Sequence, residues 1–192
     1  MTHATDTPSA RQVELLDRAY RYVLEHGIGE LSLRPLAAEI GSSPRVLLYL
    51  FESKEGLIRA LLARARADEL ALLRQADLPA GALPAVAKSL WSWLAAEEHR
   101  ALLRLWVESY ARSLVDPSGP WGGFAQSTVD DWLGVLAATQ SPSRRRSAAG
   151  EAERTLVLSV LRGALLDLLA TGNAKRTTSA VTRFLAVIGH GG

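Results

Sequence analysis

Two short amphipathic segments, separated by only three residues, constrain the fold of this chain more than any other feature. Apolar residues over 33–40 follow the i, i+3, i+4, i+7 spacing of one helix face. Gly41 ends that segment after barely two turns, and Ser43 followed by Pro44 supplies the N-cap and first turn of a second short helix. Two short helices joined in this way form a helix-turn-helix.

The remaining segments also have the spacing of helices. A first helix is predicted from the Ser9 cap to about His26, and a long fourth helix from the Ser53 cap to about Gln75. The proline- and glycine-containing segment 77–84 marks its end. No segment alternates with period two, so we expect no strands. Further helices are expected at about 84–97, 99–114, 124–139, 150–171 and 175–189, which makes an all-α fold of about nine helices.

Composition and local pattern exclude several classes of protein. The chain has no Cys, so disulfides, thiolate metal sites and Cys nucleophiles are absent. The longest apolar run, 156–169, contains Arg162 and Asp167 and is too short and too charged to span a bilayer. Met1 to Ala10 lacks the pattern of a secretory signal. We therefore expect a cytoplasmic protein with no membrane partner.

Little in the sequence points to an enzyme. The histidines, at positions 3, 26, 99 and 190, do not have the spacing of metal ligands. A GxSxG elbow, a glycine-rich phosphate loop and an HExxH motif are all missing. We expect no catalytic residues, no metal and no cofactor.

The helix-turn-helix places suitable side chains for binding double-stranded DNA. Its second helix lies in the major groove, where Arg45 can bond a guanine through two N–H groups. The hydroxyls and amides of Ser42 and Ser43 can bind phosphate at the helix N-terminus. Flanking cations and hydroxyls would fix the register on the backbone. The full predicted DNA-binding set is Ser32, Arg34, Ser42, Ser43, Arg45, Val46, Tyr49 and Lys54.

The stretch Leu31–Gly41, together with Ser43 and Leu47–Leu57, resembles the DNA-binding domain of the TetR family of transcriptional regulators. The resemblance covers about residues 11–62 and implies an N-terminal three-helix domain, 1–52, that binds DNA. It implies a C-terminal helical domain, 53–192, that binds a small effector and forms a homodimer through its last two helices. The family usually has Tyr and His where this chain has Leu48 and Leu50, so we assign the phosphate contact to Tyr49 and Lys54.

Charge gives no independent support for DNA binding. The net charge is +2, and residues 1–60 carry seven basic against eight acidic side chains. Two alternatives therefore stay open for the N-terminal region. It can be a plain helical bundle with ordinary caps, or part of a small-molecule-binding or protein-interaction module that no longer binds DNA specifically.

All five tryptophans fall between residues 91 and 132. They predict either an effector pocket with aromatic walls or ordinary core packing. For a small apolar or aromatic effector, the predicted pocket set is Trp106, Tyr110, Trp121 and Phe124. Arg104, Glu108 and Arg112 follow i, i+4 spacing, which predicts a solvated ion-pair stripe. The Ser-rich run around Arg144–Arg146 predicts a flexible surface loop.

The helix that begins near Glu151 is apolar on nearly all sides, so both of its faces need a cover. One cover is the subunit's own core, and the other is a partner subunit. The predicted dimer interface is Leu161, Leu165, Leu168, Val181, Phe184, Leu185 and Ile188. These features predict a one-component regulator, most simply a repressor that binds a palindromic operator as a dimer and leaves it when an effector binds.

Overall fold

The computed structural model describes residues 8–75 and 83–189. Within these ranges the chain is all-α, as predicted. The helices are α1 (Ala10–His26), α2 (Leu33–Glu39), α3 (Pro44–Phe51), α4 (Lys54–Gln75), α5 (Leu83–Ala95), α6 (Arg100–Val115), α7 (Phe124–Thr139), α8 (Pro142–Arg146), α9 (Ala148–Thr171) and α10 (Ala174–Gly189), with a 3-10 turn, η1 (Glu97–His99), before α6.

Serine side chains cap the first turns of helices in the N-terminal region. The Oγ atoms of Ser9, Ser43 and Ser53 accept hydrogen bonds from the backbone N–H groups three residues later, at 3.2, 3.3 and 2.9 Å. Gly41 has a φ of 68°, which glycine adopts without strain, and turns the chain from α2 toward α3. These local signals confirm the predicted helix-turn-helix.

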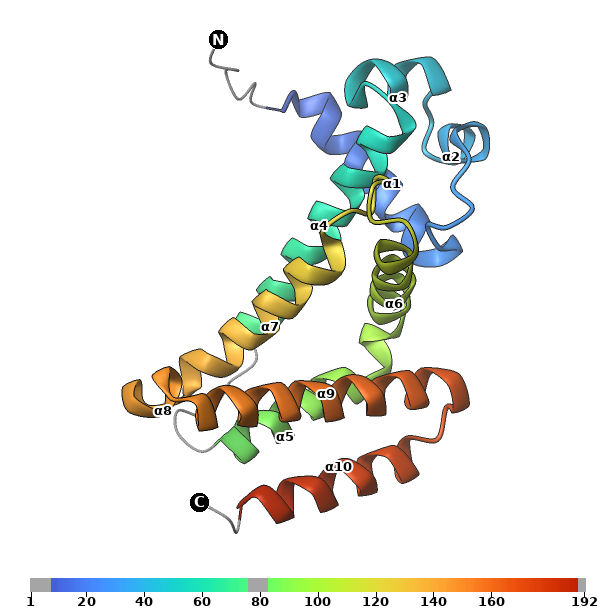
Figure 1. Ribbon diagram of the computed structural model, residues 1–192. Coiled ribbons are helices and arrows are strands. Elements are labelled where there is room, and N and C mark those ends of the chain that lie inside the picture. Colours follow the sequence, from blue (N-terminus) through green and yellow to red (C-terminus); the bar gives the residue numbers. More distant parts are fainter. Residues whose placement is uncertain (1–7, 76–82, 190–192) are drawn as a thin grey trace.

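The molecule has a small head, formed by α1, α2 and α3, and a larger body (Figure 1). The long helix α4 begins in the head, where it packs on α1 and α3, and runs into the body, where it contacts α6 and α7. α6 also touches α1, so two helices connect head and body. α9 and α10 pack on each other and on α5 at the end of the body farthest from α3 (Figure 1).

The prediction of a flexible loop around Arg144–Arg146 was wrong. The run expected to be a flexible loop forms the short helix α8, because Ser141 caps it and Pro142 occupies its first turn. The side chain of Arg144 pairs with Glu153, and Arg145 donates to the carbonyl of Ala137 at 2.9 Å. This helix raises the number of α-helices in the described part of the chain from the expected nine to ten.

Some sequence features fall on parts of the chain outside the described residues. They include the first seven residues with His3, most of the segment 77–84, and His190. In the two described ranges, no helix combines the length and apolar character needed to cross a membrane.

Candidate DNA-binding and effector sites

The outer face of α3 is free of contacts with the head. Leu47 and Phe51 are buried and hold the helix against its neighbours, whereas Arg45, Val46 and Tyr49 are exposed. Tyr49 is 85% exposed. Leu48 is also exposed, and it leaves an additional apolar side chain on this face. The helix therefore presents one cation, one phenol and two aliphatic side chains to a partner.

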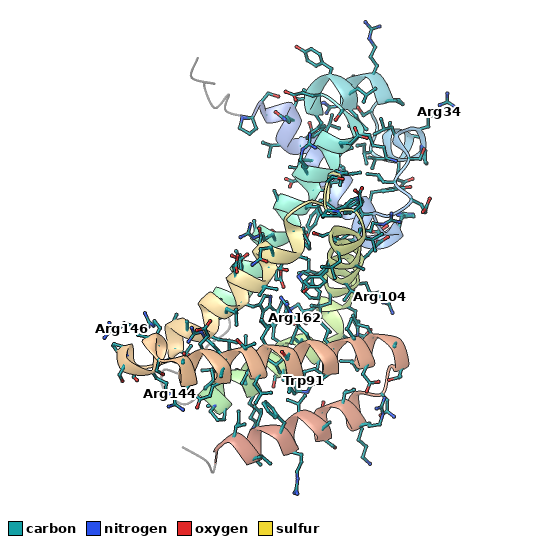
Figure 2. The ribbon with its side chains drawn as sticks, in the orientation of Figure 1. Arg34, Trp91, Arg104, Arg144, Arg146 and Arg162 are labelled. Carbon is teal, nitrogen blue, oxygen red and sulfur yellow. The ribbon has the colours of Figure 1, made fainter. Side chains whose placement is uncertain are left out.

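The predicted phosphate contacts gather beside this face. Ser32, Arg34 and Lys54 line a shallow groove between the starts of α2, α3 and α4. The side chain of Arg34 points away from the head at its edge (Figure 2). Glu30 also lines this groove and pairs with Arg112, so the two cations and the hydroxyl form the part of the lining that has the chemistry of a site for backbone phosphate.

The two turn serines have different surroundings. The Oγ of Ser43 is used as the cap of α3. The backbone N–H of Ser42 donates to the carbonyl of Ala37 at 2.8 Å, and its buried Oγ has no partner among the described residues. Some of the hydroxyl and amide groups that were predicted to bind phosphate are therefore already bonded within the protein.

Two long side chains of α1 hold the helix-turn-helix in place. Gln12 donates to the carbonyl of Leu50 at the end of α3 at 2.9 Å, and Arg18 donates to the carbonyl of Ile40 at the end of α2 at 3.1 Å. These bonds satisfy carbonyl groups that a helix end leaves unpaired. They fix the position of α3 relative to α1.

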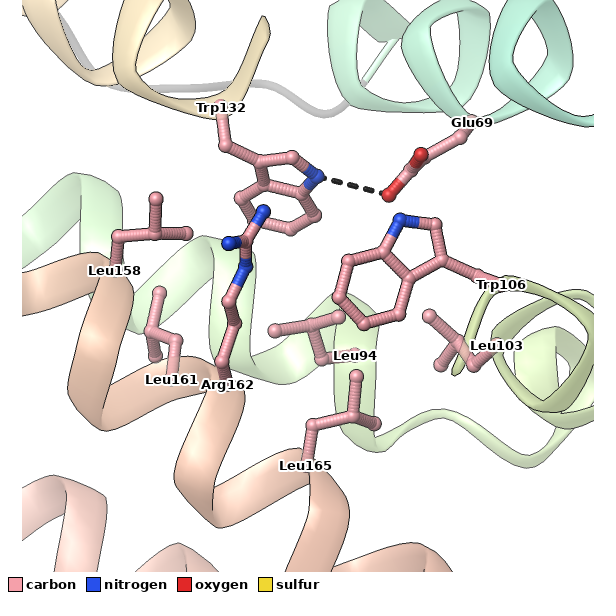
Figure 3. Close-up of a pocket in the computed structure, with 9 residues that line it drawn as sticks. All are labelled: Glu69, Leu94, Leu103, Trp106, Trp132, Leu158, Leu161, Arg162 and Leu165. Atoms are coloured by element: carbon pink, nitrogen blue, oxygen red, sulfur yellow. Dashed lines mark hydrogen bonds between the residues drawn. The ribbon is translucent and has the colours of Figure 1, made fainter. Parts of the chain in front are cut away.

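The body contains a small cavity between α4, α5, α6, α7 and α9 (Figure 3). Its volume is about 10 Å³, the room of roughly one water molecule. The indole Nε1 of Trp132 donates to Oε1 of Glu69 at 2.8 Å. Burial raises the pKa of the Glu69 carboxyl to about 7, despite that hydrogen bond. The lining residues are Glu69, Leu94, Leu103, Trp106, Trp132, Leu158, Leu161, Arg162 and Leu165.

Arg162 shares this cavity without a direct ion pair to Glu69. Its guanidinium carbon lies 5.2 Å from the ring centre of Trp106 and 5.1 Å from that of Tyr110, which are cation–π distances. Its Nη1 reaches the hydroxyl of Tyr110 at 3.5 Å, while Nε and Nη2 are buried with no partner in the described ranges. Burial lowers the pKa of the guanidinium, although Arg remains charged at any physiological pH.

The four predicted pocket residues separate into two pairs. Trp106 lines the cavity, and Tyr110 lies behind it with the two ring centres 5.0 Å apart. Trp121 and Phe124 are buried near the start of α7, where Trp121 lies under Arg112 and Phe124 faces α4 beside Arg66. The structure therefore does not bring the two pairs to one cavity.

Sequence reasoning missed the charged lining of the cavity. Arg162 interrupts an apolar run, which was treated only as evidence against a membrane helix. A charge in such a run is also a sign of a buried functional group, because an unpaired charge in an apolar core is costly. Glu69 and Trp132 gave no comparable signal, because residues on different helices meet only in the folded chain.

Glu108 and Arg112 form the predicted i, i+4 ion pair and are partly exposed, but Glu108 also makes a contact that the pattern did not predict. Its Oε2 accepts a hydrogen bond of 3.0 Å from the backbone N–H of Ile28, in the turn between α1 and α2. Arg112 lies next to it, 3.8 Å from Glu108 and 3.5 Å from Glu30. Arg104 is exposed, as expected (Figure 2). Glu108 and Arg112 therefore connect α6 of the body to the head.

Most of the predicted dimer residues lie inside the subunit. Their side chains are buried in the protomer's own core, except for Phe184 and Ile188, which are half-buried; the buried ones are Leu161, Leu165, Leu168, Val181 and Leu185. The surface of α9 is formed instead by small and apolar residues three and four positions apart. We call this row the α9 stripe: Ala152, Leu156, Ser159, Gly163, Leu166 and Ala170.

The head is the part of the chain whose sequence matches a known protein family. Residues 15–61 match the family described as bacterial regulatory proteins, tetR family. A search of curated proteins gave no match to this sequence.

Solved structures extend the likeness over the whole chain. A protein from Rhodococcus sp., classed with the TetR-family transcriptional regulators, has a TM-score of 0.73 at 18% identity, covering 93% of this chain and 98% of its own. The multidrug binding protein EbrR complexed with imidazole has a TM-score of 0.65 at 25% identity, with coverages of 95% and 96%. Its complex with proflavin has a TM-score of 0.63 at 26% identity, with coverages of 90% and 98%. The two findings agree: residues 15–61 match the tetR family of bacterial regulatory proteins, and the chain shares its fold with solved proteins of that family.

Proposed function

We propose that this protein is a one-component repressor, which binds a palindromic operator as a homodimer and releases it when a small effector occupies the body. The observation that carries the proposal is the exposed outer face of α3 within the segment that matches the family. Arg45 bonds a guanine edge, and Val46 and Tyr49 contact neighbouring bases. Ser32, Arg34 and Lys54 hold phosphates, together with the backbone amide of Ser43 at the helix start, because the amide of Ser42 is bonded to the carbonyl of Ala37.

Selection of bound fragments from a random DNA library tests this function directly. We expect enrichment of a palindrome. In anisotropy titrations Arg45→Ala should weaken binding to it by about 10- to 100-fold, because a bidentate base contact contributes roughly 1–3 kcal/mol. Arg104→Ala is the matched control, since Arg104 is also an exposed arginine but lies on the body, and the affinity of this variant should equal that of the wild type. If no sequence is enriched at low salt, the chain is instead a binding module that lacks specific DNA recognition, as Leu48 and the acidic head would allow.

We assign the dimer contact to the α9 stripe. Leu156 and Leu166 are each 50% exposed, and a Cβ at Gly163 would meet open space. A row of small and apolar residues with this spacing lets a second helix approach closely. Two copies related by a two-fold axis would present their α3 helices to half-sites about 34–36 Å apart or a multiple of it.

The helix α6 supports the proposed link between effector and DNA. On one side of α6, Trp106 lines the cavity and Tyr110 contacts Arg162 beside it, and on the opposite side Glu108 and Arg112 contact the head. A ligand that displaces Trp106 would therefore also displace the acceptor of the Ile28 N–H. EbrR, which shares this fold, has been solved with imidazole, proflavin and malachite green. A small aromatic or apolar effector in this chain is consistent with that precedent.

Glu108→Ala should loosen the connection between body and head. The buried Ile28 N–H would lose its acceptor, at a cost of about 1–3 kcal/mol in the free energy of unfolding. In hydrogen exchange, the amide of Ile28 should lose protection, whereas the amides of α9 should not. Glu25→Ala, an exposed glutamate on α1, is the control. Unchanged protection at Ile28 would show that the bond does not hold the two parts together.

A further inference from the structure

The body cavity contains more hydrogen-bond donors than acceptors. Three buried N–H donors, Nε and Nη2 of Arg162 and Nε1 of Trp106, have no acceptor in the described part of the chain. The carboxyl of Glu69 is the acidic group of the lining, and one of its oxygens already accepts from Trp132. Because unpaired buried donors are costly, a ligand that brings acceptor oxygens gains more here than one that brings donors.

The two free donors of Arg162 have a particular geometry. Nε and Nη2 lie on the same edge of the planar guanidinium, and two parallel N–H groups match the two oxygens of a carboxylate. The neighbouring rings of Trp106 and Tyr110 hold the guanidinium through cation–π contacts. Leu94, Leu103 and Leu165 complete the wall and suit an apolar ligand body.

We propose that the effector is an ionised carboxylic acid with a compact apolar body, bound through the Nε–Nη2 edge of Arg162. The proposal rests on the proposed function, because it names the effector of the same regulator. A cationic ligand would have to share the cavity with the Arg162 charge, which opposes it.

Because of Glu69, the affinity for an anionic ligand and the affinity for a cationic ligand should change in opposite directions with pH. The carboxyl of Glu69 faces Trp132 and Asp131 from α7, Arg66 from its own helix, Arg162 from α9 and the hydroxyl of Tyr20 from α1. Arg66 is paired with Asp131. Since burial raises the pKa of Glu69 to about 7, a nearby anion would raise it further and be bound with uptake of a proton. Affinity for an acid should therefore fall as pH rises from 6 to 8, whereas affinity for a cation should rise.

The cavity must widen when it binds a ligand, because it now holds roughly one water molecule. Trp106 and Trp132 are both in its wall, so their fluorescence reports the change directly. Melting temperature reports it independently, because a ligand that binds only the folded protein stabilises it.

The test uses the full-length protein without DNA and probes matched in shape. Benzoate, phenylacetate and octanoate are compared with their primary amides and with benzamidine, at up to roughly ten millimolar, where even a millimolar ligand shifts the melting temperature. We expect at least one acid to bind more than tenfold more tightly than its amide, and more tightly at pH 6 than at pH 8. The Glu69→Gln variant should bind that acid equally well at pH 6 and at pH 8.

The Arg162 variants separate the effect of the paired N–H donors from the effect of the positive charge. Arg162→Gln should weaken binding of the acid about tenfold or more, and Arg162→Lys, which keeps the charge without the paired donors, should recover only part of it. Arg154→Gln, two turns earlier on α9, removes a half-buried arginine outside the cavity and should bind as the wild type does. Tighter binding of benzamidine, equal binding of acids and amides, or no binding of any acid would overturn the proposal. None of these results would affect selection of an operator by the protein without ligand, so failure of the two proposals can be told apart.

Discussion

Leu166→Glu is expected to convert the protein to a monomer. In the proposed dimer Leu166 of each copy lies in the α9 stripe against the partner, so the variant buries a carboxylate from each copy without a counter-ion. Burying an unpaired ion costs several kcal/mol, and a combined cost on the order of 6 kcal/mol weakens a dimer about 10⁴-fold. Sedimentation velocity at micromolar concentration should show a single species with the mass of one chain. Affinity for a palindromic operator should fall at least about a hundredfold, because one head reaches only one half-site.

Leu114→Glu is the matched control for this experiment. Leu114 is 65% exposed near the end of α6, away from the stripe, and the same substitution there should leave a dimer. Both variants should keep the wild-type circular dichroism spectrum, since Leu166 is half-exposed in the subunit and contributes only partly to its core. A Leu166→Glu protein that stays dimeric would place the interface elsewhere, and the half-buried Phe184 and Ile188 on α10 would be the next surface to change.

The head could be predicted from sequence because its structure is set by local interactions. Each serine cap bonds an amide three residues away, and Gly41 allows a backbone turn that other residues resist. Such contacts involve neighbours in the chain, so their pattern is visible in a single sequence. The bonds from α1 that position α3, such as Gln12 to Leu50, span 38 residues and were not predicted.

The cavity and the surface of α9 could not be predicted for a related reason. Glu69 and Trp132 are 63 residues apart and carry no shared pattern that marks them as partners. On α9 the core side and the outer side both contain leucines, so periodicity shows that both faces need a cover but not which cover each face has. Leu161 and Leu165 belong to the core, and Leu156 and Leu166 to the surface. Only the packing of α5, α7 and α10 against one side of α9 decides this.

Glu69→Gln should remove most of the pH dependence of stability between pH 5 and pH 8. The pKa of Glu69 is raised in the folded protein from 4.5 to about 7, so the folded state holds its proton more tightly than the unfolded state. The stability that this provides is complete below about pH 4.5 and is lost as pH rises through 7. At 1.36 kcal/mol per pKa unit, the wild type should lose about 3 kcal/mol of unfolding free energy over that range.

Urea unfolding at pH 5, 6, 7 and 8, at one fixed protein concentration, measures this loss. The glutamine amide stays neutral, and its oxygen can still accept from the Trp132 indole, so the variant should match the wild type near pH 5 and exceed it by about 3 kcal/mol at pH 8. Glu151→Gln, at an exposed site on α9, should follow the wild type. A wild type whose stability instead rises with pH would mean that Arg162 keeps Glu69 ionised. The cavity would then be electrically neutral, and Arg162 would have no net charge to offer an acidic effector.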